Sequence, residues 1–198
     1  MRLPAIILAA GEGRRVGGPK ALLDLGGKTM LARTLEGCHE GGFCPCVAVV
    51  PPSLIEAIRR QQADLVLGSN PSPESGPLAS LRIGMELLPA DVCGLLLVMV
   101  DFALVSRATY ARLGESIRRD PNRLWRPVHG DRHGHPVWFP RSLFEALRAA
   151  PLDQGARSVV YANEHLWAGV EVDDPWIFRD VDTPQDLRDA QSEASRRT

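Results

Sequence analysis

The chain has 198 residues, of which 44% are hydrophobic, and its formal net charge at pH 7 is -1. This size and composition predict one domain over residues 1–198, with an ordinary apolar core and a frayed tail from about residue 194. A charge so close to zero gives no electrostatic basis for binding nucleic acid or a membrane surface, so an anionic ligand must meet a local cluster of cations. The apolar runs at 5–10 and 94–100 are too short for a signal sequence or a membrane span, and we expect a cytoplasmic protein.

In the first half of the chain, short apolar runs alternate with helical patterns. Strands are expected at 3–8, 46–50, 64–67 and 94–100, and helices at 29–40, 53–62, 77–88 and 106–118. Ser53 and Glu56 form a capping-box pattern at the start of the second helix. The alternation predicts a mostly parallel sheet with helices on both faces.

The pattern changes in the second half. Residues 123–128 and 135–139 are expected to form an antiparallel pair, 142–149 and 155–161 short helices, and 176–181 a late strand. Thr183 and Pro184 are a cap and a first helical residue, and they predict a final helix over 184–193.

A loop rich in glycine and cations follows the first expected strand directly. Residues 8–20 read LAAGEGRRVGGPK. Glycines let the backbone approach a ligand closely, and successive N–H groups in such a loop can form a nest for an anion. Arg14, Arg15 and Lys20 add positive charge. The combination suits a triphosphate; the alternative is an ordinary flexible loop with solvated charges.

Two common phosphate-binding motifs do not fit this loop. The dinucleotide fingerprint needs glycine at position 16, where the chain has Val16, and the P-loop needs Gly-Lys-Ser/Thr, whereas Gly18 is followed by Pro19. The loop instead resembles the signature of the nucleotidyltransferases that mature the molybdenum cofactor, and of their sugar-nucleotide relatives. Those proteins carry Leu-Ala-(Ala/Gly)-Gly, then Arg-Met-Gly and a Lys three positions on.

The resemblance implies a fold, an activity and a set of residues. The fold is a Rossmann-like, three-layer α/β/α nucleotidyltransferase fold of the glycosyltransferase-A-like type, with a mostly parallel mixed sheet and a small antiparallel section. Arg15 and Lys20 are implied to be catalytic. The implied nucleotide-binding residues in the loop are Leu8, Ala9, Ala10, Gly11, Gly13, Arg15 and Lys20. Ala10 matches the cytidylyltransferase version of the loop, because the guanylyltransferase version reads Ala-Gly-Gly.

Asp101 follows the apolar run 94–100, at the carboxyl end of an expected parallel strand, where open α/β sheets bind ligands. A carboxylate there can hold Mg²⁺, so Asp101 is a candidate metal ligand and catalytic residue; the alternative is a helix cap or strand terminator. Phe102 and Ala103 depart from the family's pattern after this aspartate.

A second carboxylate comes from residues 180–187, which read DVDTPQDL. They resemble the family's late motif Asp-(Ile/Val)-Asp-Thr-Pro-Glu-Asp-Leu, which implies Asp182 as the second metal ligand. The alternative is that Asp180 and Asp182 only favour the dipole of the following helix.

Residues 70–81 read NPSPESGPLASL and join a short strand to a helix. Gly76 and Ser80 lie near the start of that helix, where free N–H groups favour anionic or polar ligands. The resemblance implies that this loop contacts the base and ribose; the alternative is an ordinary turn. The residues of this loop are closer to the guanylyl branch of the family, whereas Ala10 matches the cytidylyl branch. Both CTP and GTP therefore stay open as donors.

Two late segments point to the acceptor. Residues 129–139 read HGDRHGHPVWF and resemble the family's Gly-x-x-Gly-His-Pro-Val-x-Phe stretch, which implies that His135 lies in or next to a pterin pocket. Residues 152–157 read LDQGAR and resemble Gly-Asp-x-Gly-Ala-Arg, in which Arg157 would bind an acceptor phosphate bidentately. The alternatives are a structural histidine and a solvated arginine.

Together these features predict a Mg²⁺-dependent nucleotidyltransferase that transfers CMP or GMP from CTP or GTP to the phosphate of molybdopterin, with release of pyrophosphate. The resemblance also implies transient contact with a molybdoenzyme or its chaperone. Two alternatives stay open. One is a sugar-1-phosphate or alditol-phosphate nucleotidyltransferase, and the other is a non-catalytic nucleotide-binding regulatory or chaperone protein.

Overall fold

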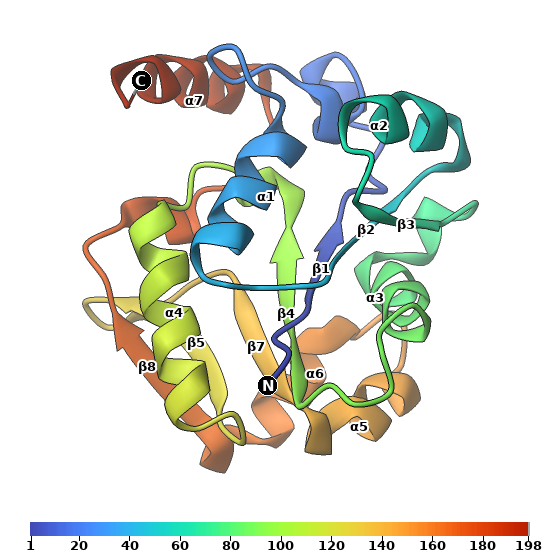
Figure 1. Cartoon of the computed structure of the whole chain (residues 1–198). Coiled ribbons are helices and arrows are strands. Elements are labelled where there is room, and N and C mark those ends of the chain that lie inside the picture. Colours follow the sequence, from blue (N-terminus) through green and yellow to red (C-terminus); the bar gives the residue numbers. More distant parts are fainter. Residues whose placement is uncertain (198) are drawn as a thin grey trace.

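One mixed sheet forms the centre of the molecule in the computed structural model, which describes residues 1–197 (Figure 1). The strand order is β3-β2-β1-β4-β7-β5-β6, and β8 also pairs with β5. The strands are β1 (Ala5–Leu8), β2 (Cys46–Val50), β3 (Val66–Ser69), β4 (Gly94–Met99), β5 (Leu124–His129), β6 (Arg132–His133), β7 (Val137–Pro140) and β8 (Trp167–Glu171).

Most neighbouring strands are parallel. β1 pairs in parallel with β2 and with β4, β2 with β3, and β5 with β8. β7 runs antiparallel between β4 and β5, and β6 is antiparallel to β5. The expected mixed sheet with a small antiparallel section is therefore confirmed.

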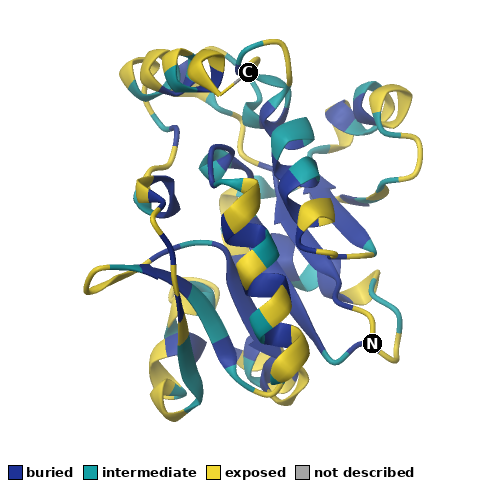
Figure 2. Ribbon diagram, turned by 60° about the vertical axis from the view of Figure 1, so that its left-hand side comes forward, coloured by how far each residue is buried: buried dark blue, intermediate teal, exposed yellow. Residues whose placement is uncertain are grey.

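Helices cover both faces of this sheet. α1 (Met30–Glu40), α2 (Ile55–Gln61), α4 (Arg107–Arg119) and α7 (Pro184–Arg196) contribute to the core on one face, and α3 (Pro77–Glu86), α5 (Phe144–Ala149) and α6 (Gly155–Ala162) to the core on the other. The central strands β1, β2, β4 and β7 are almost entirely buried, and the outer helix faces are exposed (Figure 2). Among residues 1–197, no helix is both long and apolar enough to cross a bilayer.

Alternation along β1 explains the two cores. Ala5 and Ile7 belong to the core under α1, whereas Ile6 and Leu8 belong to the core under α3. Successive side chains of a strand point to opposite faces, and a strand buried on both sides therefore reads as a continuous apolar run.

Several expected elements are confirmed, including β2 at 46–50 and α4 after the cap Ser106, whose side chain accepts the N–H of Thr109. Thr183 caps α7 in a full capping box with Asp186. This last helix continues to Arg196, beyond its expected end at 193 and into the tail expected to fray from about 194.

Two expectations at the ends of elements are wrong. The side chain of Ser53 caps nothing, because the chain forms a 3-10 turn over Pro52–Leu54 before α2 begins at Ile55. The apolar residues 176–181 do not form a strand. Asp174 accepts the N–H of Trp176 and Pro175 fixes the first helical position, so Pro175–Phe178 is a 3-10 helix, and the last strand is β8.

Packing of α3 against the sheet depends on a glycine. A Cβ at Gly84 would lie 2.4 Å from Cγ2 of the fully buried Ile6 and 3.3 Å from Cγ2 of Val49. This close approach holds α3, and with it the loop before α3, at a fixed height over β1 and β2.

We predict that Gly84→Ala lowers the free energy of unfolding by about 1–3 kcal/mol, the cost of overpacking a tight core. Helix propensity alone would favour alanine by about 1 kcal/mol, but the clash with a rigid strand residue is larger. Urea unfolding measures the change. Arg112→Ala, on the exposed face of α4, is the control and should stay within about 0.5 kcal/mol. A more stable Gly84→Ala protein would contradict this account of the packing.

Candidate functional site

The loop after β1 folds around Gly13. Its carbonyl accepts the N–H groups of Val16 and Gly18, at 2.9 and 3.2 Å. Its φ is 59°, and a Cβ there would lie 1.9 Å from the carbonyl oxygen of Gly18, so only glycine fits. The loop ends in a 3-10 turn, Lys20–Leu22, which begins with the site lysine.

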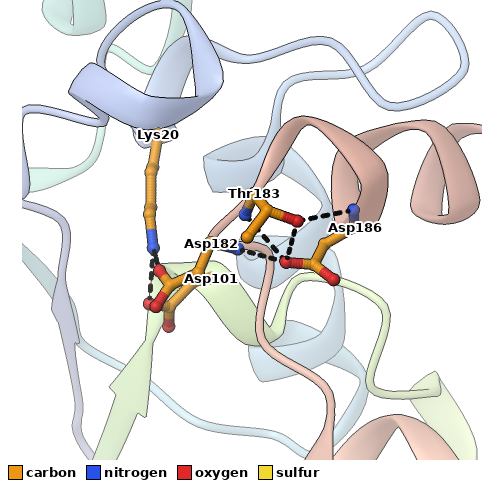
Figure 3. A network of polar contacts seen from close by, with 5 residues as sticks. All are labelled: Lys20, Asp101, Asp182, Thr183 and Asp186. Carbon is orange, nitrogen blue, oxygen red and sulfur yellow. Dashed lines mark hydrogen bonds and ion pairs between the residues drawn. The ribbon is translucent and has the colours of Figure 1, made fainter.

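Lys20 joins two carboxylates from distant parts of the chain (Figure 3). Its Nζ donates to Oδ2 of Asp101 at 3.0 Å and to Oδ1 of Asp182. The side chains of Lys20 and Asp101 are only 12% and 16% exposed, whereas that of Asp182 is 48% exposed. The structure thus brings together the lysine and the two acids that the sequence singled out.

The start of α7 holds Asp182 in place. Oδ2 of Asp186 accepts the backbone N–H groups of Asp182 and Thr183, at 3.2 and 2.7 Å (Figure 3). One residue earlier, the N–H of Val181 donates to the carbonyl oxygen of Asp101 at 3.1 Å. The capping box and this backbone bond together fix the segment before α7 beside the end of β4.

Charge and burial oppose each other in this cluster. Burial works against the charge of Lys20, but the carboxylates of Asp101 and Asp182 outweigh it, so the pKa of Lys20 lies above its ordinary value. Burial also raises the pKa of Asp101. The lysine counteracts that rise without cancelling it, because Asp101 also faces the negative charges of Asp180 and Asp182.

The same acids can hold a metal ion. Ligand oxygens of Asp101, Asp180 and Asp182 lie within 4.8 Å of one another. Oδ1 of Asp101 is buried and has no hydrogen-bond partner among residues 1–197. Carboxylate oxygens are the ligands that hard divalent cations prefer. Asp180 was not expected to take part, although its place two residues before Asp182 was a signal that both could face one side.

A first cavity, of about 510 Å³, opens beside the glycine loop, and we call it the loop cavity. No atom lies within 4 Å of a Cβ built on Gly11, so this glycine leaves open space at the wall. Arg14 pairs with Glu12, whereas Arg15 has no ion pair among the described residues. The cavity is lined by Gly11, Glu12, Gly13, Arg14, Arg15, Lys20, Pro73, Glu74 and Asp182.

A second cavity, of about 140 Å³, lies between β1 and the start of α3, and we call it the small cavity. Asn70, which the sequence analysis missed, donates from Nδ2 to Oγ of Ser80 at 2.8 Å and so ties the loop after β3 to α3. The side chain of Ala9 belongs to the core on the other face of the sheet, and Ala9 is not part of the lining of this cavity. The lining includes Leu8, Ala10, Gly11, Lys20, Gly76, Ser80 and Asp101.

A third cavity, of about 640 Å³, lies against α6, and we call it the α6 cavity. Both residues expected at the acceptor, His135 and Arg157, line it. Burial, with a contribution from Arg126, lowers the pKa of His135 to about 4, and its Nδ1 has no partner among residues 1–197. The ring of Phe102 lies 4.7 Å from the ring of His135, so this departure from the family's pattern forms part of the wall.

The three cavities meet at the carboxylates. Lys20 borders the loop cavity and the small cavity, and Asp101 borders the small cavity and the α6 cavity. Asp182 lines the loop cavity and Asp180 the α6 cavity. Ligands in separate cavities could therefore reach one set of oxygen ligands.

Comparisons with known proteins agree with this arrangement. A molybdenum cofactor guanylyltransferase from Shewanella sp. (strain MR-4) is 31% identical over 193 residues, which cover 93% of each chain. A 2-C-methyl-D-erythritol 4-phosphate cytidylyltransferase from Frankia casuarinae is 45% identical over 60 residues, which cover 29% of this chain and 23% of that protein.

Solved structures show the same fold. The crystal structure of Rv0371c from Mycobacterium tuberculosis H37Rv matches with a TM-score of 0.80 at 27% identity, over 97% of this chain and 99% of that one. A structure of Rv0371c in complex with manganese matches with a TM-score of 0.77 at 26% identity and the same coverage. Residues 5–166 match the family model of the MobA-like NTP transferase domain. The chain therefore belongs to the MobA-like NTP transferase family and is a nucleotidyltransferase.

Proposed function

We propose that this protein transfers a nucleoside monophosphate from CTP or GTP to the phosphate of a molybdopterin-type acceptor, with Mg²⁺ at the carboxylate cluster and with release of pyrophosphate. The observation that carries the proposal is the meeting of three cavities at Asp101, Asp180 and Asp182. The name of the guanylyltransferase relative, which matches over most of the chain, supports the acceptor.

The donor triphosphate would bind in the loop cavity. The acceptor phosphate is already an anionic nucleophile, so one of its oxygens forms the new bond to the α-phosphorus while the bond to pyrophosphate breaks. No side chain has to act as a nucleophile, and catalysis rests on positioning and on charge neutralisation. Arg15 and Lys20 would offset the negative charge that develops on the leaving group.

The residues at the cluster suit a hard divalent cation. Asp101, with its buried and unpartnered Oδ1, and Asp182 would hold Mg²⁺, with Asp180 as a third oxygen ligand. Bound there, Mg²⁺ supplies charge neutralisation at the phosphates. The manganese complex of Rv0371c supports a divalent ion in this fold.

The acceptor would bind in the α6 cavity, against His135 and Arg157. Because the pKa of His135 is about 4, this side chain is neutral at pH 7 and offers a hydrogen-bonding edge rather than a charge. Arg157 supplies a guanidinium on α6, where it already donates to the hydroxyl of Tyr161.

A second candidate is an alditol-phosphate nucleotidyltransferase. The local 45% identity to the cytidylyltransferase from Frankia casuarinae favours it. That match spans only 60 residues, whereas the match to the guanylyltransferase covers 93% of each chain. The molybdopterin acceptor is therefore the better supported of the two.

Pyrophosphate release tests the function directly. We expect release with Mg²⁺, molybdopterin and either CTP or GTP, and none when the metal is chelated. Release only with 2-C-methyl-D-erythritol 4-phosphate or a sugar-1-phosphate would replace the proposed acceptor. NTP binding without release for every acceptor would instead favour the non-catalytic reading.

In the same assay, Lys20→Ala and Asp101→Ala should each lower turnover on the order of 10²-fold or more, the scale seen when one preorganised charge-stabilising group is lost. Lys28→Ala is the matched control, because Lys28, the other lysine of the chain, precedes α1 and pairs with Glu36 of that helix. Unchanged turnover in either site variant would remove that residue from the mechanism.

The methyl group of Ala10 tests donor choice. Ala10 and Ser80 both line the small cavity, where the base of the donor would bind. The larger purine base would gain most from removing the methyl group of Ala10. We predict that Ala10→Gly raises the ratio of kcat/KM for GTP to that for CTP by roughly tenfold, the usual effect of one methylene-sized group in a pocket. Ala48→Gly removes a buried methyl of β2 under α1 and should leave the ratio unchanged. An unchanged ratio in Ala10→Gly would mean that the base binds elsewhere.

The low pKa of His135 predicts a pH-dependent stability. In the unfolded chain His135 binds a proton near pH 6.5, whereas in the folded protein it binds one only near pH 4. The contribution of His135 to the free energy of unfolding is therefore full above pH 6.5 and is lost between pH 6.5 and 4. At about 1.4 kcal/mol per pH unit, the loss reaches ~3 kcal/mol. Urea unfolding at several pH values should show this slope in the wild type and much less of it in His135→Gln. His165→Gln, at an exposed position, should keep the slope. Parallel curves for the wild type and His135→Gln would contradict the assignment.

A further inference from the structure

Three arginines line the α6 cavity: Arg126 on β5, Arg132 on β6 and Arg157 on α6. None of them forms an ion pair with a carboxylate among residues 1–197. These three arginines share the cavity with the carboxylates of Asp101 and Asp180, which also line it. The interpretation that follows rests on the proposed function, because it concerns the acceptor.

Arg126 is the half-buried one of the three, whereas Arg132 and Arg157 are exposed. Its Nη2 donates to the carbonyl oxygen of His133 at 3.4 Å, but its Nε is buried and has no hydrogen-bond partner in the described part of the chain. Its guanidinium carbon lies 5.6 Å from the ring of Trp167. Burial lowers the pKa of Arg126; Tyr161 opposes this effect and the positive charge of Arg157 adds to it.

Other partly buried arginines in this fold are saturated by carbonyl groups. Arg82 donates to the carbonyl oxygens of Leu147 and Ala150, and Arg33 to those of Leu25 and Gly26. These arginines pin loops to helices, and their hydrogen bonds account for their burial. No such hydrogen bonds explain the burial of Arg126 Nε. An unpaired buried donor costs free energy unless a ligand satisfies it.

The position of Arg126 separates it from the carboxylates. β7 lies between β4, which leads to Asp101, and β5, which carries Arg126. Two strand spacings amount to roughly 10 Å across the sheet. Trp138 of β7 pairs with Leu96 of β4 and with Trp125 of β5, so Arg126 lies level with the middle of β4 rather than with its end. This separation along and across the sheet places a group bound at Arg126 apart from a phosphate bound at the carboxylates.

We infer that Arg126 is the anchor for a second anionic, oxygen-bearing group of the acceptor, held at the end of the α6 cavity remote from the reacting phosphate. The planar fork of a guanidinium matches two oxygens of one group, which gives orientation as well as attraction. Arg157, which borders the same cavity and repels Arg126, shares the charge of that group. Both substrate ends are then fixed, one at the carboxylates and the other at Arg126.

Steady-state kinetics test this role. Arg126→Gln should raise the KM for the acceptor at least about tenfold, the loss expected for one charge-assisted bidentate contact, with the KM for NTP unchanged. Arg126→Lys keeps the charge but not the fork and should restore only part of the affinity. Arg123→Gln is the control, because Arg123 holds the carbonyl oxygen of Trp167 outside the cavity, and it should leave both KM values unchanged. Equal changes in both KM values, or none, in Arg126→Gln would overturn the inference.

A second measurement does not depend on turnover. Sulfate serves as a simple oxyanion, and the ¹⁵N–¹H signal of Arg126 Nε reports its binding. We expect a saturable shift of that signal with sulfate, at constant ionic strength, and none with chloride. If the wild type turns over, the KM values decide the question. If no acceptor is used, the proposed function fails, and the sulfate titration alone decides: a saturable shift supports an oxyanion site at Arg126, and no shift refutes it.

Discussion

The contact between the Lys20 ammonium and two carboxylates is the interaction on which the rest of the site depends. Asp101, Asp180 and Asp182 bring their oxygens within 4.8 Å of one another, and Asp101 is largely buried. Like charges at that distance repel, and burying them without a partner is costly. Lys20 offsets both costs while it also begins the turn that ends the glycine loop. One side chain therefore couples the position of the glycine loop to the position of the acids.

Strand register brings the coupled segments close enough for this contact. β1 and β4 are parallel neighbours, and Leu8 pairs with Met99, so the chain leaves both strands at the same level of one sheet edge. The glycine loop and Asp101 follow directly from these two ends. The third segment, which contains Asp180 and Asp182, is held beside them by a backbone hydrogen bond from the N–H of Val181 to the carbonyl oxygen of Asp101. The capping of α7 holds its other end. The edge of the sheet thus fixes two of the segments, and a helix start fixes the third.

Sequence predicted most of what depends on local chemistry. The strand at 46–50, the glycine-rich loop after the first strand, and the cap Thr183 followed by Pro184 are each encoded in adjacent residues. Sequence failed where tertiary contacts decide. Residues 176–178 are apolar enough for a strand, yet Asp174 turns them into a 3-10 helix, because its carboxylate is held by Ser106 and Thr109 of another element. β8, only one of whose residues is buried, carries little pattern of its own and forms because β5 offers a free edge.

The same distinction separates the two sides of the site. The loop cavity and the small cavity are lined mainly by two continuous segments, 8–20 and 70–80, each of which follows a strand of the parallel half of the sheet. The α6 cavity is assembled from β4, β5, β6, β7, α6 and the 3-10 helix after β8, whose contributions meet only in the folded chain. Arg126 carried no signal in the sequence for this reason. Changes on β5 or α6 can alter what binds in the α6 cavity while the glycine loop and the carboxylates stay in place. A fold divided in this way can keep one nucleotidyl-transfer chemistry and exchange its acceptor.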